Sequence, residues 1–279
     1  MEYTDIIDVL DNTHDAVYDT LTVPEHLRNI IKQISRVNTY ETGVLAKGQV
    51  ESENFENFKK LTKMASDDEL LSLLNNKNKT VAVYAAVGLL NRKPELLEEL
   101  FQKFLNLKFK VHTRNGCIFE DQSPAEPLYR DYYRSLNFNE LQTDSKLRKL
   151  DSLIIYHSDS PESLLREAFR YRVYPKNFIK RIEILAFKNH SISAIDYLNK
   201  WVKGDYSNLL QKEFISMIEN DSLAVNKKKY LAELLSFNNV KNKEFIIRYL
   251  KKDTISSDDT EIIWKLNDNG VFDGEYPIK

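Results

Sequence analysis

The sequence lacks most of the residues that mark secreted, membrane-spanning or turn-rich proteins. Its single cysteine, Cys117, excludes an internal disulfide framework and fits a reducing compartment. Seven glycines and seven prolines are too few for a β-sandwich or barrel rich in turns. No apolar run is long enough for a transmembrane helix, and the acidic start lacks the basic and apolar regions of a signal peptide. We therefore expect a cytoplasmic protein that makes no membrane contact.

Charged and apolar residues are both abundant, but charge is unevenly distributed. Apolar residues make up 42% of the chain and charged residues 29%, which is typical of an ordered soluble protein. The net charge is −4 over residues 1–125, +7 over residues 126–252 and −5 over residues 253–279. The middle of the chain is thus a basic segment between acidic ends. Such a segment attracts acidic partners, although charged helix faces are also common wherever helices meet solvent.

The clearest helical pattern lies between residues 66 and 107. Ser66 and Glu69 have the spacing of a capping box, in which each side chain bonds a backbone N–H group at a helix start. A leucine-rich helix, a turn at 75–79 and a second helix follow. Because the second helix, residues 81–90, is apolar on nearly all sides, we expect other helices to cover it on two sides. Pro94 then begins a third helix.

Amphipathic helices continue through the second half of the chain. Apolar residues recur at helical spacing in paired segments, and short polar turns join each pair. The pairs begin near residues 177, 207 and 242, and this period of roughly 30–35 residues is typical of helical-hairpin repeats. The paired segments are 178–188 with 192–202, 207–218 with 223–235, and 243–251 with 260–266. The pattern predicts an all-α protein, an α-solenoid of stacked helical hairpins.

Other stretches refine this prediction. Residues 40–50 contain two glycines and predict a loop. Residues 108–119 alternate in polarity around the turn signal Asn115-Gly116, which predicts a short β element. Single helices are expected over 141–156 and 162–172. The chain either divides into an N-terminal helical region, residues 1–122, and a C-terminal hairpin array, residues 123–279, or forms one continuous solenoid.

Residues 68–90 resemble a HEAT-type repeat unit. Such units combine a leucine-rich helix, a turn, and a second helix with the pattern Val-Arg-x-x-Ala-x-x-x-Leu. Val81, Ala85 and Leu89 match this pattern, whereas Ala82 stands where the family usually has arginine. The resemblance implies a HEAT-like α-solenoid with one clear unit at 66–107. It also implies a binding function, because HEAT-like proteins mostly bind other macromolecules.

No motif for catalysis, a cofactor or a metal stands out. The five histidines are scattered and lack the spacing of metal ligands. His112 and Cys117 could form a nucleophilic pair, but no third orienting group is evident and a structural thiol is the more usual role. Gly43 and Gly48 have the spacing of a phosphate-binding loop that lacks its lysine. We expect no cofactor and no metal, and we rank an enzymatic function below a binding function.

Two clusters combine tyrosine with arginine, at residues 129–134 and 166–174. These residue types are enriched at protein-interface hot spots, and they also suit nucleic-acid backbones and bases. Alternatively, the tyrosines fill contacts between helices and the arginines extend along them. Since both clusters lie in the basic segment, an acidic partner surface is expected. The predicted partner-binding residues are Tyr133, Arg134, Arg170, Tyr171, Arg172 and Tyr174.

These observations rank three classes of function. The first is a non-enzymatic protein-interaction module, such as a bacterial adaptor or an immunity protein that neutralises a toxin. The second is a nucleic-acid-binding HEAT-like protein, including one that resembles the HEAT-like DNA glycosylases. The net charge of −2 counts against this second class, because nucleic-acid binders usually carry a strong basic surface. An enzyme of another kind is the third class.

Overall fold

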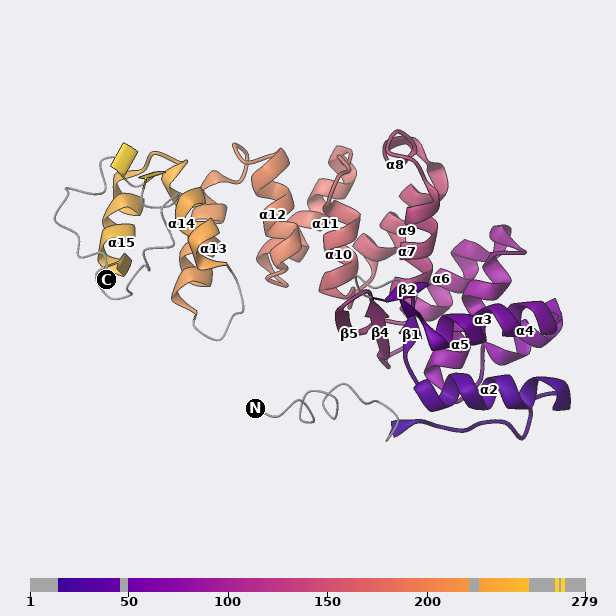
Figure 1. Ribbon diagram of the computed structural model, residues 1–279. Coiled ribbons are helices and arrows are strands. Elements are labelled where there is room, and N and C mark those ends of the chain that lie inside the picture. Colours follow the sequence, from indigo (N-terminus) through magenta and orange to yellow (C-terminus); the bar gives the residue numbers. More distant parts are fainter. Residues whose placement is uncertain (1–14, 46–49, 221–225, 251–263, 266, 269–279) are drawn as a thin grey trace, which may run out of the picture. The chain divides into compact units, whose positions relative to one another are not determined.

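The computed structural model describes residues 15–45, 50–220, 226–250, 264, 265, 267 and 268. These residues form helices packed in neighbouring pairs and a small β element, which confirms the predicted fold class (Figure 1). Within this part of the chain, no helix combines the length and the apolar character needed to cross a membrane. The chain divides into two compact units, residues 1–172 and residues 173–279. The predicted division after residue 122 falls inside the first unit.

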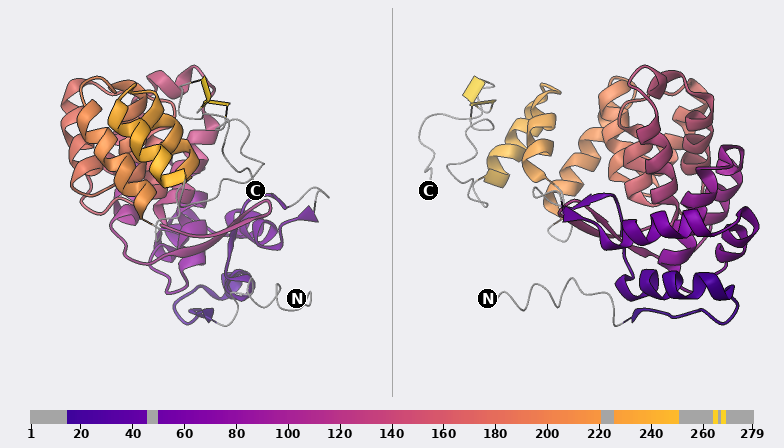
Figure 2. Two further views of the ribbon diagram at one scale, coloured as in Figure 1. Left: turned by 90° about the vertical axis from the view of Figure 1, so that its left-hand side faces the viewer. Right: turned by 45° about the vertical axis from the view of Figure 1, so that its right-hand side comes forward.

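Paired helices build the first unit. They are α2 (Glu25–Val37), α3 (Glu53–Met64), α4 (Asp67–Leu73), α5 (Lys79–Leu90), α6 (Leu97–Leu105), α7 (Ala125–Ser135), α8 (Glu140–Thr143), α9 (Ser145–Tyr156) and α10 (Glu162–Phe169), with a 3-10 turn at Pro94–Leu96. Helix α2 packs on α3, α4 on α5, α6 on α7 and α9 on α10. The pair α2 and α3 lies side by side (Figure 2). Each pair buries one apolar stripe per helix, such as Leu27, Ile30, Ile31 and Ile34 on α2.

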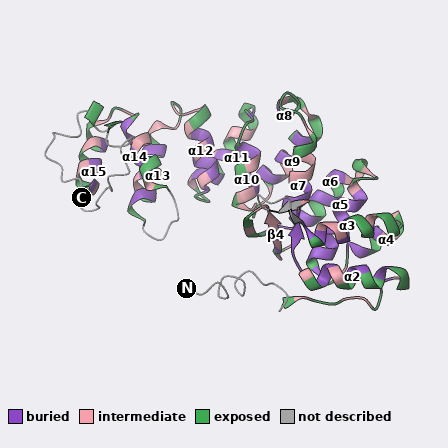
Figure 3. Ribbon diagram, viewed as in Figure 1, coloured by how far each residue is buried: buried purple, intermediate pink, exposed green. Residues whose placement is uncertain are grey.

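Helix α5 lies at the centre of the first unit. Every residue from Thr80 to Leu89 is buried, as expected for a helix that is apolar on all sides (Figure 3). It contacts α2, α3, α4 and α7. A Cβ atom at Gly88 would lie only 2.8 Å from Cγ2 of Thr62, so this position requires glycine for α3 to approach α5 closely.

The predicted β element is present, but it is larger than expected. Strands β4 (Val111–Asn115) and β5 (Ile118–Gln122) form an antiparallel hairpin whose turn contains Gly116 with a positive φ of 63°. The short strand β1 (Tyr40–Glu41) pairs in parallel with β4, so that Tyr40 lies opposite Thr113. Strands β2 (Val44–Leu45) and β3 (Val50–Glu51) form a second, two-stranded hairpin. The prediction of a simple loop over residues 40–50 was therefore wrong.

Helix boundaries follow the capping residues of the sequence. The predicted capping box is present, because Ser66 Oγ accepts from the N–H of Glu69, and Oε2 of Glu69 accepts from the N–H of Ser66. The single helix predicted over 141–156 is wrong. Asp144 is extended and its carboxylate caps α9 at the N–H of Leu147, 2.6 Å away, which separates α8 from α9. Likewise α10 ends at Phe169, three residues earlier than predicted.

Glu126, at the start of α7, gives a pH-dependent prediction. Its Oε1 atom accepts from Ser163 Oγ at 2.6 Å and from the N–H of Ser123 at 3.1 Å. Burial raises the pKa of Glu126 above its ordinary value of 4.5, although these hydrogen bonds and Arg130 act in the opposite direction. A raised carboxyl pKa means that the ionised form is less favourable in the folded than in the unfolded chain. Its stabilising contribution is present below the ordinary pKa and is lost as pH rises through the raised pKa.

Glu126→Gln should therefore gain stability relative to the wild type as pH rises from about 4 to about 7. The glutamine Oε1 atom can still accept both hydrogen bonds, and no charge has to be buried. Urea denaturation at the two pH values measures this change. Glu53→Gln, at an exposed site, is the control and should show no comparable trend. If Glu126→Gln and the wild type differed in stability by the same amount at both pH values, the raised pKa of Glu126 would be contradicted.

The second unit consists of helical hairpins. Its helices are α11 (Lys176–Phe187), α12 (Ile192–Trp201), α13 (Ser207–Glu219), α14 (Lys227–Leu235) and α15 (Val240–Leu250). Helix α11 pairs with α12 and α13 with α14, as the sequence predicts. Buried Gln211 of α13 accepts a hydrogen bond of 2.9 Å from Asn242 of α15, which links neighbouring hairpins. Most of the helix predicted over 260–266 lies outside the described residues.

Candidate interaction surface

A buried ion pair joins three helices of the first unit at the second Tyr/Arg cluster. Arg172 follows α10, and its Nε atom lies 2.5 Å from Oδ2 of Asp151 on α9. Its Nη2 group donates to Oδ1 of Asp151 at 3.0 Å and also to the hydroxyl of Tyr129 on α7. The Tyr129 hydroxyl in turn donates to Asp151 at 2.7 Å. Arg172 and Asp151 are only 2% and 0% exposed, so this network is an internal connection between α7, α9 and the end of α10.

The local sequence explains why the segment that carries Arg172 is not helical. Helix α10 ends at Phe169, and the chain does not return to helix until after Pro175. Proline disfavours a helical conformation at the residue before it. In the intervening stretch Arg170 and Tyr171 are exposed, whereas Arg172 is buried. Nη2 of Arg172 also donates to the carbonyl oxygen of Glu167 at 3.0 Å, which closes the end of α10.

The two clusters meet at Tyr133, which lies near Arg172 of the second cluster. The guanidinium of Arg170 lies over the ring of Tyr171 at 5.1 Å, and that of Arg172 lies 5.9 Å from the ring of Tyr133. Burial raises the pKa of Tyr133, and the nearby Tyr171 raises it further. We define the Tyr/Arg surface as Tyr133, Arg170 and Tyr171 together with Arg134 and Phe138, which are exposed and follow Tyr133 in the sequence.

The segment around α8 borders this surface. The side chain of Gln142 on α8 donates to the carbonyl oxygen of Tyr171. Phe138, between α7 and α8, is 74% exposed. Phe138 is not among the binding residues that the sequence predicts. The available signal was an aromatic residue flanked by Asn137 and Asn139, outside any helical stripe.

The surface thus contains aromatic rings and guanidinium groups on a fixed base. The side chain of Arg134 forms no hydrogen bond or ion pair with another residue of the described ranges. Burial raises the pKa of half-buried Asp131, and the charge of Arg134 acts in the opposite direction. Arg170 makes one long ion pair, 3.7 Å, with Glu167. An exposed pair of this length contributes little to stability, so the Arg170 guanidinium can bind a partner at little energetic cost.

Two of the six predicted binding residues lie in the interior. Arg172 is buried in the ion pair described above. Tyr174, in the second unit, is 8% exposed, its N–H donates to the hydroxyl of Tyr197 at 2.8 Å, and its ring packs against Phe178. Burial leaves neither side chain open to a partner. Both therefore have packing roles here, and the other four residues remain the candidates for partner binding.

The structure offers no support for the His112–Cys117 pair. The two nitrogens of His112 contact Asp15 and Asp121, while Cys117 is exposed in the β4–β5 turn. Across the described ranges, no three His, Cys, Asp or Glu side chains are grouped closely enough to hold a metal ion.

Comparison of the chain with family models, with curated proteins and with solved structures gives no match.

Proposed function

We propose that this protein is a non-enzymatic, HEAT-like interaction module that binds an acidic region of another protein through the Tyr/Arg surface. An adaptor or an immunity protein that covers a toxin has this kind of role. The observation that carries the proposal is the exposure of Arg170 and Tyr171 directly beside the buried Arg172–Asp151 pair. The paired helices support the HEAT-like assignment.

The buried pair matters because it fixes the surface before any partner arrives. Binding usually requires side chains and loops to become ordered, and this ordering opposes association. Here three helices and the segment after α10 are already joined by buried hydrogen bonds. The exposed rings offer large contact areas and the guanidinium groups offer directional donors, which is the composition of interface hot spots.

Alanine at Arg170 and Tyr171 together should weaken binding of the partner by about tenfold or more, equivalent to about 1.4 kcal/mol or more. The partner is first captured from a lysate of the native host by the wild-type protein and identified by mass spectrometry. Its dissociation constant is then measured with purified components for each variant. Arg170→Glu should weaken binding further than Arg170→Ala, because an acidic partner surface would repel the introduced carboxylate.

Arg166→Ala and Tyr156→Ala are the matched controls. Both residues are exposed on α10 and α9 but lie outside the Tyr/Arg surface. They should bind like the wild type, and all variants should keep the wild-type helical content. Equal affinity of the Arg170/Tyr171 double variant and the wild type would place the interface elsewhere.

Nucleic acid is the second partner class that Arg and aromatic side chains suit. Labelled duplex and single strands are titrated at two salt concentrations to test it. Tight binding that falls steeply with salt, and that Arg170→Glu abolishes, would replace the protein partner with a nucleic acid.

A further inference from the structure

The first described residues of the chain lie over the start of α5. Residues 15–19, which we call the strap, have no helical or strand structure after Asp15. Asn78 Nδ2 donates to the carbonyl oxygen of Val17 at 3.1 Å, and Asn76 Nδ2 donates to that of Asp19 at 2.9 Å. The N–H of Lys77 donates to Oδ2 of Asp19 at 3.0 Å. Three hydrogen bonds therefore join the turn between α4 and α5 to the strap.

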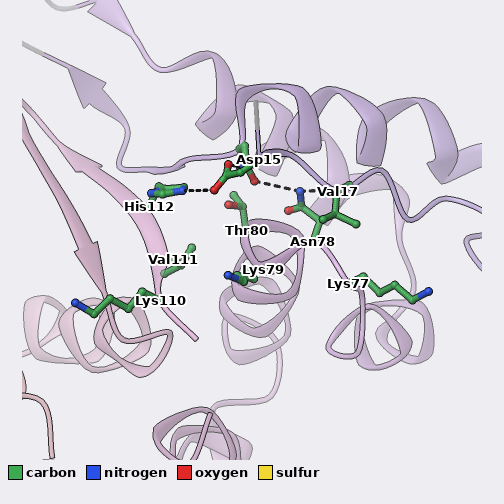
Figure 4. Close-up of a pocket in the computed structure, with 10 residues that line it drawn as sticks. Asp15, Val17, Lys77, Asn78, Lys79, Thr80, Lys110, Val111 and His112 are labelled. Carbon is green, nitrogen blue, oxygen red and sulfur yellow. Dashed lines mark hydrogen bonds and ion pairs between the residues drawn. The ribbon is translucent and has the colours of Figure 1, made fainter. Parts of the chain in front are cut away.

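His112 fixes the other end of the strap. Its Nε2 atom lies 3.0 Å from Oδ2 of Asp15, and its Nδ1 atom lies 2.5 Å from Oδ1 of Asp121 on β5 (Figure 4 shows the Asp15 contact). Asn38 Nδ2 donates to the other carboxylate oxygen of Asp15 at 2.6 Å. Both ring nitrogens of His112 thus face carboxylate oxygens. An imidazolium can donate to both, whereas a neutral imidazole has one proton and would present a lone pair to the second carboxylate.

Charged residues line the pocket beside His112. The charged groups that contact His112 are Asp15 of the strap and Asp121 of β5. Lys110, before β4, Lys79 of α5 and Lys77 of the α4–α5 turn line the same small pocket, as does the neutral Asn38 that follows α2. Figure 4 shows that these three lysines line the small pocket beside Asp15. Burial lowers the pKa of His112, but the hydrogen bonds and charges of Asp15 and Asp121 outweigh burial and raise it above 6.5.

We propose that residues 15–19 are a proton-controlled strap, which protonated His112 holds over the start of α5 and which leaves when His112 becomes neutral. The hydrogen bonds from Asn76, Lys77 and Asn78 can be replaced by water, whereas the charge-assisted contact between His112 and Asp15 is stronger, so it has the largest influence on whether the strap stays. A raised histidine pKa means that this contact is fully present below the ordinary pKa and is lost as pH rises through the raised one. Release exposes the side chain of Asn78 at the start of α5, which donates to the strap and is only 1% exposed while the strap is in place.

Hydrogen exchange and NMR on the full chain test the strap directly. The Lys77 amide is the reporter, because it donates to the strap carboxylate of Asp19. Its protection, corrected for the pH dependence of chemical exchange, should fall between about pH 6 and pH 9, along with the His112 titration. His112→Gln should lower the protection about tenfold even at the acidic end. His112→Arg, which keeps its charge, should stay protected at the alkaline end.

His190→Gln is the matched control, since His190 also lies near a carboxylate, 3.3 Å from Glu213, but belongs to the second unit. It should leave the Lys77 amide unchanged. Asp15→Ala removes the strap side of the contact and should release the strap at every pH. It therefore tests the proposal even if His112→Gln does not fold. The same Lys77 protection in the wild type, His112→Gln and Asp15→Ala would overturn the proposal, as would a pH-dependent loss that persists in His112→Arg.

Discussion

Arg172→Ala should destabilise the first unit by about 3–5 kcal/mol. The substitution leaves the Asp151 carboxylate, which is 0% exposed, without its cationic partner. It also removes the donors that reach Tyr129 and the end of α10. An uncompensated buried charge is far less favourable than an exposed one. For a unit of 172 residues the melting temperature should fall by on the order of 10 °C.

Arg170→Ala is the matched control for this experiment. It removes the same side chain two residues earlier, but from an exposed position with one long ion pair. Its effect in urea denaturation should stay within about 0.5 kcal/mol. If Arg172→Ala were as stable as Arg170→Ala, the buried network would not hold the first unit together.

A double variant separates two free energies: the stability lost when one buried charge has no partner, and the net contribution of the ion pair to stability. Asp151→Leu combined with Arg172→Met replaces both charges by apolar side chains. It should be more stable than either single variant, because no charge is left buried. Some loss relative to the wild type should remain, since the Tyr129 hydroxyl would have no carboxylate to donate to.

These two arginines show the limit of what the sequence could predict about the site. The residue types of the Tyr/Arg clusters were enough to nominate a surface. They could not separate buried Arg172 from exposed Arg170, because the difference depends on Asp151, which lies on another helix. Asp151 would be an ordinary surface carboxylate if α9 were rotated. Only the packing of α7, α9 and α10 decides which arginine turns inward.

The fold was predictable where local chemistry determines it. The capping box at Ser66, Pro94 at the start of a 3-10 turn and the Asn115-Gly116 turn all lie at the element boundaries that they predict. Strand β1 was not predicted, because its position depends on residues far away in the sequence rather than on local chemistry. Two residues carry no periodic signal, and contacts with β4 and α5, far along the chain, hold this strand in place.

Helix α5 supplies the group that keeps β1 in place. The hydroxyl of Tyr84 accepts from the N–H of Glu41 at 2.8 Å and donates to the carbonyl oxygen of Glu41 at 3.0 Å. Tyr84 is 0% exposed, and its ring packs against Tyr40 and Phe58 with centroids 4.7 and 5.0 Å away. The carboxylate of Glu41 accepts from Ser52 Oγ at 2.6 Å and from the N–H of Asn54 at 3.1 Å, which joins β1 to the start of α3. One phenol therefore satisfies both backbone groups of a residue that links three elements.

Tyr84→Phe should therefore destabilise the first unit by about 3 kcal/mol although it removes a single oxygen atom. The ring and its packing remain, but the N–H and C=O groups of buried Glu41 both lose their partner, and each unsatisfied group costs about 1–3 kcal/mol. Urea denaturation measures the loss, and hydrogen exchange at the Glu41 amide should show it locally. Tyr132→Phe is the control, because its half-buried hydroxyl makes one hydrogen bond, to Asp144, and water can replace that bond. Equal stability of Tyr84→Phe and Tyr132→Phe would mean that β1 does not depend on the Tyr84 hydroxyl and that the β1–β4 pairing alone holds this strand.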